Sequence, residues 1–180
     1  IGPDLVFGNA YLGSIHGYKF EDVDGDGVND GEPRLEGVDI TLTGTDGQGN
    51  LIGPITVPAD SNGEYGFASL LPGTYTVTET PPDGSAATTP VSYTVTLDSR
   101  QELVALAGQS GIVEPDPRAE VVIGPDLVFG NAYLGSIHGY KFEDVDGDGV
   151  DDGEPRLAGV DITLTGTDGQ GNAVGPITVP

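Results

Sequence analysis

The sequence predicts an all-β protein with the fold of an antiparallel β-sandwich, and three observations indicate this class. Short runs of β-branched and aromatic residues alternate with polar residues at a period of two. Clusters of Gly, Pro, Asn and Asp separate these runs. Apolar residues show no convincing helical spacing. Seven or eight short strands with turns between them are typical of a sandwich.

An internal repeat divides the chain into domains. Residues 1–58 recur as residues 123–180, an offset of 122, with four changes: Asn29/Asp151, Glu36/Ala158, Leu51/Ala173 and Ile52/Val174. A unit of 122 residues has the size of one ordinary domain. We therefore expect residues 1–12 to be the last strand of a preceding repeat, residues 13–134 a complete sandwich, and residues 135–180 the incomplete first part of the next repeat.

Within the complete repeat, alternation and turn chemistry predict the elements in order. Strands are expected at residues 14–20, 38–43, 55–57, 65–67, 74–80, 93–97, 102–107 and 121–133, after the strand at residues 1–12 that closes the preceding repeat. TDGQGN at residues 45–50 is typical of a turn, and the Asn-Gly pair in DSNG at residues 60–63 favours a tight hairpin. Prolines predict a loop at residues 108–118. The junction near residue 13 is too short for a flexible linker, so we expect a stiff, rod-like array.

The most informative stretch is an acidic loop at residues 22–32, DVDGDGVNDGE, which returns at residues 144–154 as DVDGDGVDDGE. Acidic residues at relative positions 1, 3, 5 and 9, with Gly at position 6, have the spacing of an EF-hand calcium loop. Position 12 is Pro33, and no amphipathic helices flank the loop, so it is not a helix-loop-helix sensor. The predicted Ca²⁺ ligands are Asp22, Asp24, Asp26, Val28 (backbone carbonyl), Asp30 and Glu32, and in the second copy Asp144, Asp146, Asp148, Val150, Asp152 and Glu154.

The alternative for this loop is a solvated acidic turn that holds no ion. Calcium is favoured because, without a cation, five carboxylates within eleven residues would repel one another.

Composition excludes several classes of partner. The net charge of −23 and the pI near 4.1 argue against nucleic acid and anionic membrane surfaces. The absence of Cys excludes disulfides and thiolate metal sites. The sequence contains no membrane span. His16 and its copy His138 have no neighbours that suggest a metal site or a catalytic triad, and we interpret both as ordinary strand residues.

Three segments carry a family resemblance: GYKFEDVDGDGVNDGEPRLEGVDITLTG (17–44), DSNGEYGFASLLPGTYTVTETPPDG (60–84) and DLVFGN (126–131). In this order they resemble the B-type repeat domains of Gram-positive collagen adhesins and serine-aspartate-repeat adhesins. The resemblance implies a prealbumin-like or reversed immunoglobulin-like sandwich, a location on the bacterial cell surface, and service as a stalk. It also supports calcium in the acidic loop, which relatives carry there.

The collagen-adhesin branch of this family often joins a Lys on the first strand to an Asn on the last, assisted by a buried acid. Lys19, Asn131 and Glu79 occupy the matching places. Two alternatives remain open: either Lys19 faces inward and forms this isopeptide bond, or Tyr18 and Phe20 occupy the inner face and turn Lys19 outward.

We therefore expect a structural, calcium-stiffened repeat of an extracellular adhesin or filament, without catalytic activity. Its partners would be neighbouring repeats of the same chain or neighbouring subunits of a polymer. One alternative is an adhesive module that binds ligand through residues 108–118, although this loop has no aromatic residue. Another is an accessory sandwich of a secreted enzyme, against which near-identical tandem copies argue. In the second copy, Val160, Ile162 and Leu164 are expected to form an uncovered apolar face.

Overall fold

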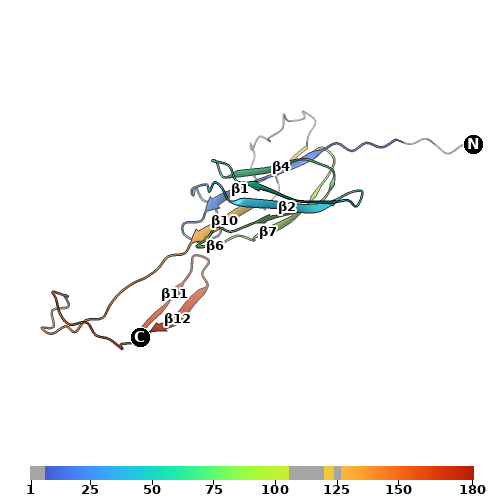
Figure 1. Cartoon of the computed structure of the whole chain (residues 1–180). Helices are drawn as coiled ribbons and strands as arrows, with labels where there is room; N and C mark the ends of the chain where they lie inside the picture. The colour runs from blue at the N-terminus through green and yellow to red at the C-terminus, as the bar shows by residue number, and fades with distance from the viewer. Residues whose placement is uncertain (1–6, 106–119, 124–126) are drawn as a thin grey trace, which may run out of the picture. The chain divides into compact units, whose positions relative to one another are not determined.

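The computed structural model describes residues 7–105, 120–123 and 127–180, and it contains twelve strands and no helix within these ranges (Figure 1). The chain divides into two compact units, Ile1–Tyr133 and Leu134–Pro180. The strands of the first unit are β1 Gly13–Glu21, β2 Asp39–Asp46, β3 Leu51–Pro58, β4 Glu64–Leu70, β5 Gly73–Glu79, β6 Ser85–Ala87, β7 Ser92–Leu97, β8 Gln101–Val104, β9 Glu120–Ile123 and β10 Val128–Tyr133. Among the described residues, no helix is long and apolar enough to span a membrane.

Two sheets form the first unit and confirm the predicted antiparallel β-sandwich. The larger sheet has the order β6-β10-β1-β8-β9, with β4 paired to the other side of β1, and the smaller sheet has the order β3-β2-β5-β7. All pairs in the smaller sheet are antiparallel. In the larger sheet β1 runs parallel to both β8 and β10, and β8 runs parallel to β9. Strand β1 is thus the central element of the larger sheet (Figure 1).

The core lies between the two sheets, where alternate residues of each strand meet. Its buried side chains include Ile15, Phe67, Leu103 and Phe129 from the larger sheet and Ile40, Leu42, Tyr75, Val77 and Leu97 from the smaller sheet. Each fully buried apolar side chain of this size contributes roughly 1.5–3 kcal/mol through loss of contact with water. The same alternation leaves threonines on the outer face of the smaller sheet, where Thr41 pairs with Thr56 and Thr76 with Thr94 through their hydroxyls.

Strand β1 departs from simple alternation because both of its faces are buried. Ile15 and Lys19 face the core, whereas Tyr18 and Phe20 are buried on the opposite face. The chain that follows β1 folds back over this second face, and the guanidinium of Arg34 lies 3.4 Å from the centre of the Tyr18 ring. The alternative in which Tyr18 and Phe20 turn Lys19 outward is therefore wrong, since Arg34 covers the Tyr18 ring and the Phe20 ring lies next to Gly130 on β10.

Three other expectations need correction. The Asn62-Gly63 turn is local, with the Gly63 N–H donating to the Asp60 carbonyl, but it joins β3 to β4 in different sheets and makes no hairpin. The described residues 7–12 form no strand, although their copy, residues 129–134, contributes most of β10. In β10 these residues pair with β1 and β6, and residues 7–12 make no such pairing with a neighbouring strand in the described structure. The predicted strand at residues 102–107 ends at Val104.

The predicted loop at residues 108–118 lies outside the described residues. Strand β6, which spans three residues, was not predicted, because SAA carries no apolar alternation.

The second unit contains the antiparallel hairpin of β11 Ile162–Thr167 and β12 Ala173–Val179, which repeats the pairing of β2 with β3. Its apolar side chains are uncovered: Val160, Ile162 and Leu164 are exposed, as expected from the sequence. They line an open groove of about 870 Å³ together with Ile137, Leu157 and Ile177. The local sequence is thus sufficient for the hairpin to form in both copies, whereas burial of its apolar face requires the other strands of the sandwich.

Candidate functional site

The first candidate site is the acidic loop between β1 and β2. Its base is closed by an isolated bridge between Phe20 and Arg34 and by a 2.8 Å hydrogen bond from the Glu21 N–H to the Pro33 carbonyl. The second copy closes in the same way through Phe142 and Arg156. The loop therefore folds locally, whether or not the rest of the sandwich surrounds it.

Within the first loop, carboxylates organise the backbone. Asp22 is fully buried, and its two oxygens accept hydrogen bonds from the N–H groups of Gly25, Asp26 and Gly27 at 2.7–3.1 Å. Asp26 accepts from the Val28 N–H at 2.7 Å. Gly25 and Gly27 adopt φ values of 76° and 84°, which L side chains rarely take, so these two glycines allow the sharp turn.

The loop brings three of the predicted ligands together. Carboxylate oxygens of Asp22, Asp24 and Asp26 lie within 4.8 Å of one another, and those of Asp144, Asp146 and Asp148 do the same. Asp30 and Glu32 do not belong to this cluster, nor do Asp152 and Glu154 in the second copy. The carbonyls predicted at Val28 and Val150 stay a prediction.

Glu32 nevertheless lies at the loop. Its Oε1 accepts a 2.5 Å hydrogen bond from the Val23 N–H, and its Oε2 is buried without a hydrogen-bond partner among the described residues. Glu154 repeats both features in the second copy, with Val145 as the donor. A buried carboxylate oxygen without a donor is costly unless a cation neutralises it. The donor set therefore fits Ca²⁺, which prefers several carboxylate oxygens.

Two residues of this site were not found from the sequence. Asn29 accepts from the N–H groups of Gly31 and Glu32 through its Oδ1 and shapes the end of the loop. Thr88 comes from beyond β6 and hydrogen-bonds Asp22. Burial raises the pKa of Asp22, but the bonds from Thr88, Gly27, Gly25 and Asp26 outweigh it and lower the pKa overall. Asn29 could have been found as an Asx turn, whereas Thr88 has no local signal.

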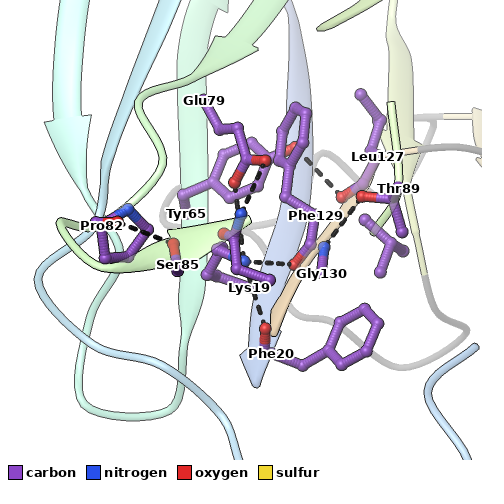
Figure 2. Close-up of polar contacts among 12 residues, drawn as sticks. Lys19, Phe20, Tyr65, Glu79, Pro82, Ser85, Thr89, Leu127, Phe129 and Gly130 are labelled. Carbon is purple, nitrogen blue, oxygen red and sulfur yellow. Dashed lines mark hydrogen bonds and ion pairs between the residues drawn. The ribbon is translucent and has the colours of Figure 1, made fainter. Parts of the chain in front are cut away.

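The second candidate site is a buried cluster of Lys19 on β1, Glu79 on β5 and Asn131 on β10. Lys19 Nζ lies 3.5 Å from Glu79 Oε2 and donates to the carbonyls of Phe20 and Phe129 at 3.1 and 3.0 Å (Figure 2). Asn131 Nδ2 donates to Glu79 Oε1 at 3.4 Å, and Asn131 Oδ1 is buried without a hydrogen-bond partner in the described structure. Glu79 thus lies between the amine and the amide, facing inward as its alternation with Tyr75 and Val77 predicts.

Burial sets the protonation of this cluster. Desolvation lowers the pKa of Lys19 to about 8, although Glu79 and Asp22 oppose the shift. Desolvation also raises the pKa of Glu79, against the effects of Lys19 and Asn131. Both directions favour the neutral forms, an amine and a carboxylic acid.

The two histidines differ in environment. His16 is buried on β1, and its Nε2 lies 3.5 Å from Glu102 Oε1 on β8. His138 is exposed and contacts the Ser136 hydroxyl, and it lies outside any strand, so the expectation of a strand residue is wrong for this copy. Neither joins a described cluster of metal-ligating side chains.

Comparison with known proteins assigns the family. The SdrD B-like domain model matches residues 13–113, and the chain belongs to this family. It is 33% identical over 164 residues to serine-aspartate repeat-containing protein F of Staphylococcus epidermidis, covering 89% of this chain and 9% of that protein. It is 30% identical over 159 residues to serine-aspartate repeat-containing protein D of Staphylococcus aureus strain Newman, covering 85% of this chain and 11% of that protein.

The chain thus spans about a tenth of the length of these relatives. Among solved structures, the minor pilin GBS52 of Streptococcus agalactiae aligns with a TM-score of 0.44 and 14% identity, over 72% of this chain and 48% of that one. The family defines an extracellular, cell-surface structural module rather than an enzyme.

Proposed function

We propose that this chain is a calcium-stiffened structural repeat in the stalk or filament of an extracellular adhesin. The observation that carries the proposal is the acidic loop, which gathers three carboxylates within 4.8 Å in both copies. The buried, unpartnered Oε2 atoms of Glu32 and Glu154 support it, because they leave negative charge to be neutralised. Asp22, Asp24 and Asp26 would hold the ion in the first loop, and Asp144, Asp146 and Asp148 in the second.

The position of the first loop explains how an ion would stiffen the repeat. The Asp22 N–H donates to the Asn131 carbonyl at 2.9 Å, and Glu21 pairs with Asn131 across β1 and β10. The loop is therefore attached to the last strand, close to where the chain leaves the sandwich. An ion that cross-links the loop carboxylates would also restrict this exit.

Isothermal titration of the chelator-treated chain with CaCl₂ tests the proposal. We expect two sites per chain with Kd values of about 10⁻⁴–10⁻³ M, typical of extracellular modules. Asp24→Asn should remove one site, whereas Asp83→Asn, the same charge change at an exposed residue outside the loop, should leave both. Absence of calcium binding in the unmodified chain would overturn the proposal.

The buried cluster favours a second function, an intramolecular isopeptide cross-link between Lys19 and Asn131. A pKa of about 8 leaves about a tenth of the Lys19 side chain as free amine at pH 7. In the reaction the Nζ lone pair attacks Cγ of Asn131, and protonated Glu79 donates to the amide. The Cγ–Nδ2 bond breaks, Nδ2 leaves as ammonia with the proton from Glu79, and the attacking Nζ returns one of its own protons to Glu79, so amine plus amide yield a secondary amide plus ammonia.

Such a bond would join the first strand of the repeat to the last. Because β1 and β10 are parallel neighbours in register at Lys19 and Phe129, tension applied to the two ends of the repeat would fall on this pair. A covalent link there suits a stalk.

A further inference from the structure

Tyr11 makes two described contacts with the turn between β7 and β8. Its ring lies under the guanidinium of Arg100, with Cζ 3.6 Å from the ring centre. Its backbone N–H donates to the Ser99 hydroxyl at 2.9 Å. Arg100 adopts a φ of 65°, an uncommon conformation for a residue other than Gly, Asn or Asp. The turn therefore contacts the segment that precedes β1 through one cation–π pair and one hydrogen bond.

This segment is a copy of the end of the sandwich's own last strand. Residues 7–12 have the same sequence as residues 129–134, so Tyr11 corresponds to Tyr133 at the end of β10. Residues 7–12, which contact the Ser99 and Arg100 turn through Tyr11, thus have the sequence that ends a repeat. They lead directly into β1, the strand that begins the next repeat.

The two partners of this contact belong to opposite ends of a sandwich. Ser14, near the start of β1, pairs with Glu102, just beyond the turn, whereas Glu21 at the end of β1 pairs with Asn131. About seven strand residues, or about 23 Å, separate these positions. We call the end that carries Ser99 and Arg100 the proximal end, and the end that carries Tyr133 the distal end.

Charge also differs between the two ends. The distal end carries the acidic loop, whose Asp22 is hydrogen-bonded to Asn131. The proximal end presents Arg100, one of only six basic residues in the chain. Asp98 and Glu102 flank Arg100 in the sequence, so the proximal end carries charges of both signs, whereas the loop at the distal end is purely acidic.

We propose that the Ser99 and Arg100 turn is the docking site for the terminal tyrosine of the preceding repeat, and that this contact sets the angle between successive domains. The partner is another copy of the same repeat, and the inference rests on the proposed stalk. A cation–π contact and one hydrogen bond are too weak to hold separate molecules together. They suffice in a tandem chain, because the covalent junction holds the two surfaces at high effective concentration.

Amide hydrogen exchange of the 180-residue chain, read by NMR, tests the proposal. In the unmodified chain the Tyr11 amide should exchange at least several-fold more slowly than an unstructured amide. Arg100→Asn, which tolerates the left-handed φ, and Tyr11→Leu, which keeps apolar bulk but removes the ring, should each abolish this protection. Tyr133→Leu is the matched control, since the chain holds no second copy of Ser99 and Arg100, and it should leave Tyr11 protected.

The same spectra report whether each variant stays folded, through the amides of Ile40 and Val77 in the core. If Arg100→Asn does not fold, the result for Tyr11→Leu decides the test. Tyr11 is half exposed, so its substitution is not expected to unfold the domain. An unprotected Tyr11 amide in the unmodified chain, or protection that both folded variants retain, would overturn the proposal. Calcium titration of Arg100→Asn distinguishes a failure of the docking proposal from a failure of the proposed function, since this variant should bind calcium normally.

Discussion

Lys19 Nζ and Glu79 Oε2 lie 3.5 Å apart with both side chains fully removed from solvent. Removing two charges from water costs several kcal/mol per ion, so a buried pair of this kind is weak support for stability on its own. The lowered pKa of Lys19 and the raised pKa of Glu79 instead increase the fractions present as uncharged amine and acid. Those are the forms that amide transfer to Asn131 requires.

We predict that the intact chain weighs one ammonia less than its sequence, because Lys19 and Asn131 are joined. Glu79→Ala should restore the full mass, since it removes the proton carrier. Lys19→Ala and Asn131→Ala should have the masses of their sequences, whereas the matched variants at the copies, Lys141→Ala and Asn9→Ala, should still lack one ammonia. Intact-mass spectrometry under denaturing conditions makes the measurement. If the unmodified chain has the mass calculated from its sequence, with no loss of ammonia, Lys19 and Asn131 are not cross-linked.

We predict that calcium raises the melting temperature of the chain, because binding to the folded state alone stabilises it by mass action. At a calcium concentration 100 times Kd the gain is about 2.7 kcal/mol for one site. Thermal melts followed by circular dichroism, with calcium and with chelator, measure it. Asp26→Asn should reduce the shift and Asp83→Asn should not. Superimposable melts in calcium and chelator would show that the loop has no stabilising ion.

Local pattern predicted much of the fold because the smaller sheet has one buried and one solvated face. In β5, Tyr75, Val77 and Glu79 alternate with exposed or half-exposed threonines, and the period of two identifies strand and face together. The turn at residues 45–50 was likewise predictable, since Asp46 accepts bonds from the N–H groups of Gln48 and Asn50 as an Asx turn does.

The larger sheet was less predictable, because its central strand is buried on both faces. From Ile15 to Phe20 every residue of β1 is buried, so alternation could not decide the direction of Lys19. The parallel pairing of β1 with β8 and β10 joins residues more than 80 positions apart, and no local signal encodes it. In the acidic loop, spacing identified the three clustered aspartates but could not show that Glu32 binds the Val23 N–H.

We predict that acidification destabilises the chain partly through His16. Burial lowers its pKa below 6.5, although Glu102 on β8 and Glu64 on β4 oppose the shift. The pKa of His16 is therefore lower in the folded state than in the unfolded state, so the unfolded state binds the proton more tightly. The stability contributed by neutral His16 is fully present above pH 6.5 and is lost as the pH falls through the lower pKa of the folded state. His16→Gln should lose less unfolding free energy than the unmodified chain between pH 7 and 5 in urea titrations.

The repeat supplies the control for this titration, because His138 is the exposed copy of His16. His138→Gln should follow the unmodified chain at every pH. If the two variants show the same dependence on pH, burial of His16 does not contribute to the acid response.

We predict that one substitution has different consequences in the two copies, because only one copy buries the residue. Leu42 on β2 is fully buried, whereas its copy Leu164 on β11 is 42% exposed within an identical local sequence, TLTGTDGQGN. Strand propensity and turn chemistry are thus the same at both sites, and the difference isolates packing. Leu42→Ala should lower the free energy of unfolding of the first unit by about 2–5 kcal/mol through lost transfer energy and the cavity left behind. Leu164→Ala should change that free energy by less than about 0.5 kcal/mol. Urea unfolding followed by exchange of the Ile40 and Val77 amides measures both, and equal losses would show that the core does not lie where the two sheets of the first unit meet.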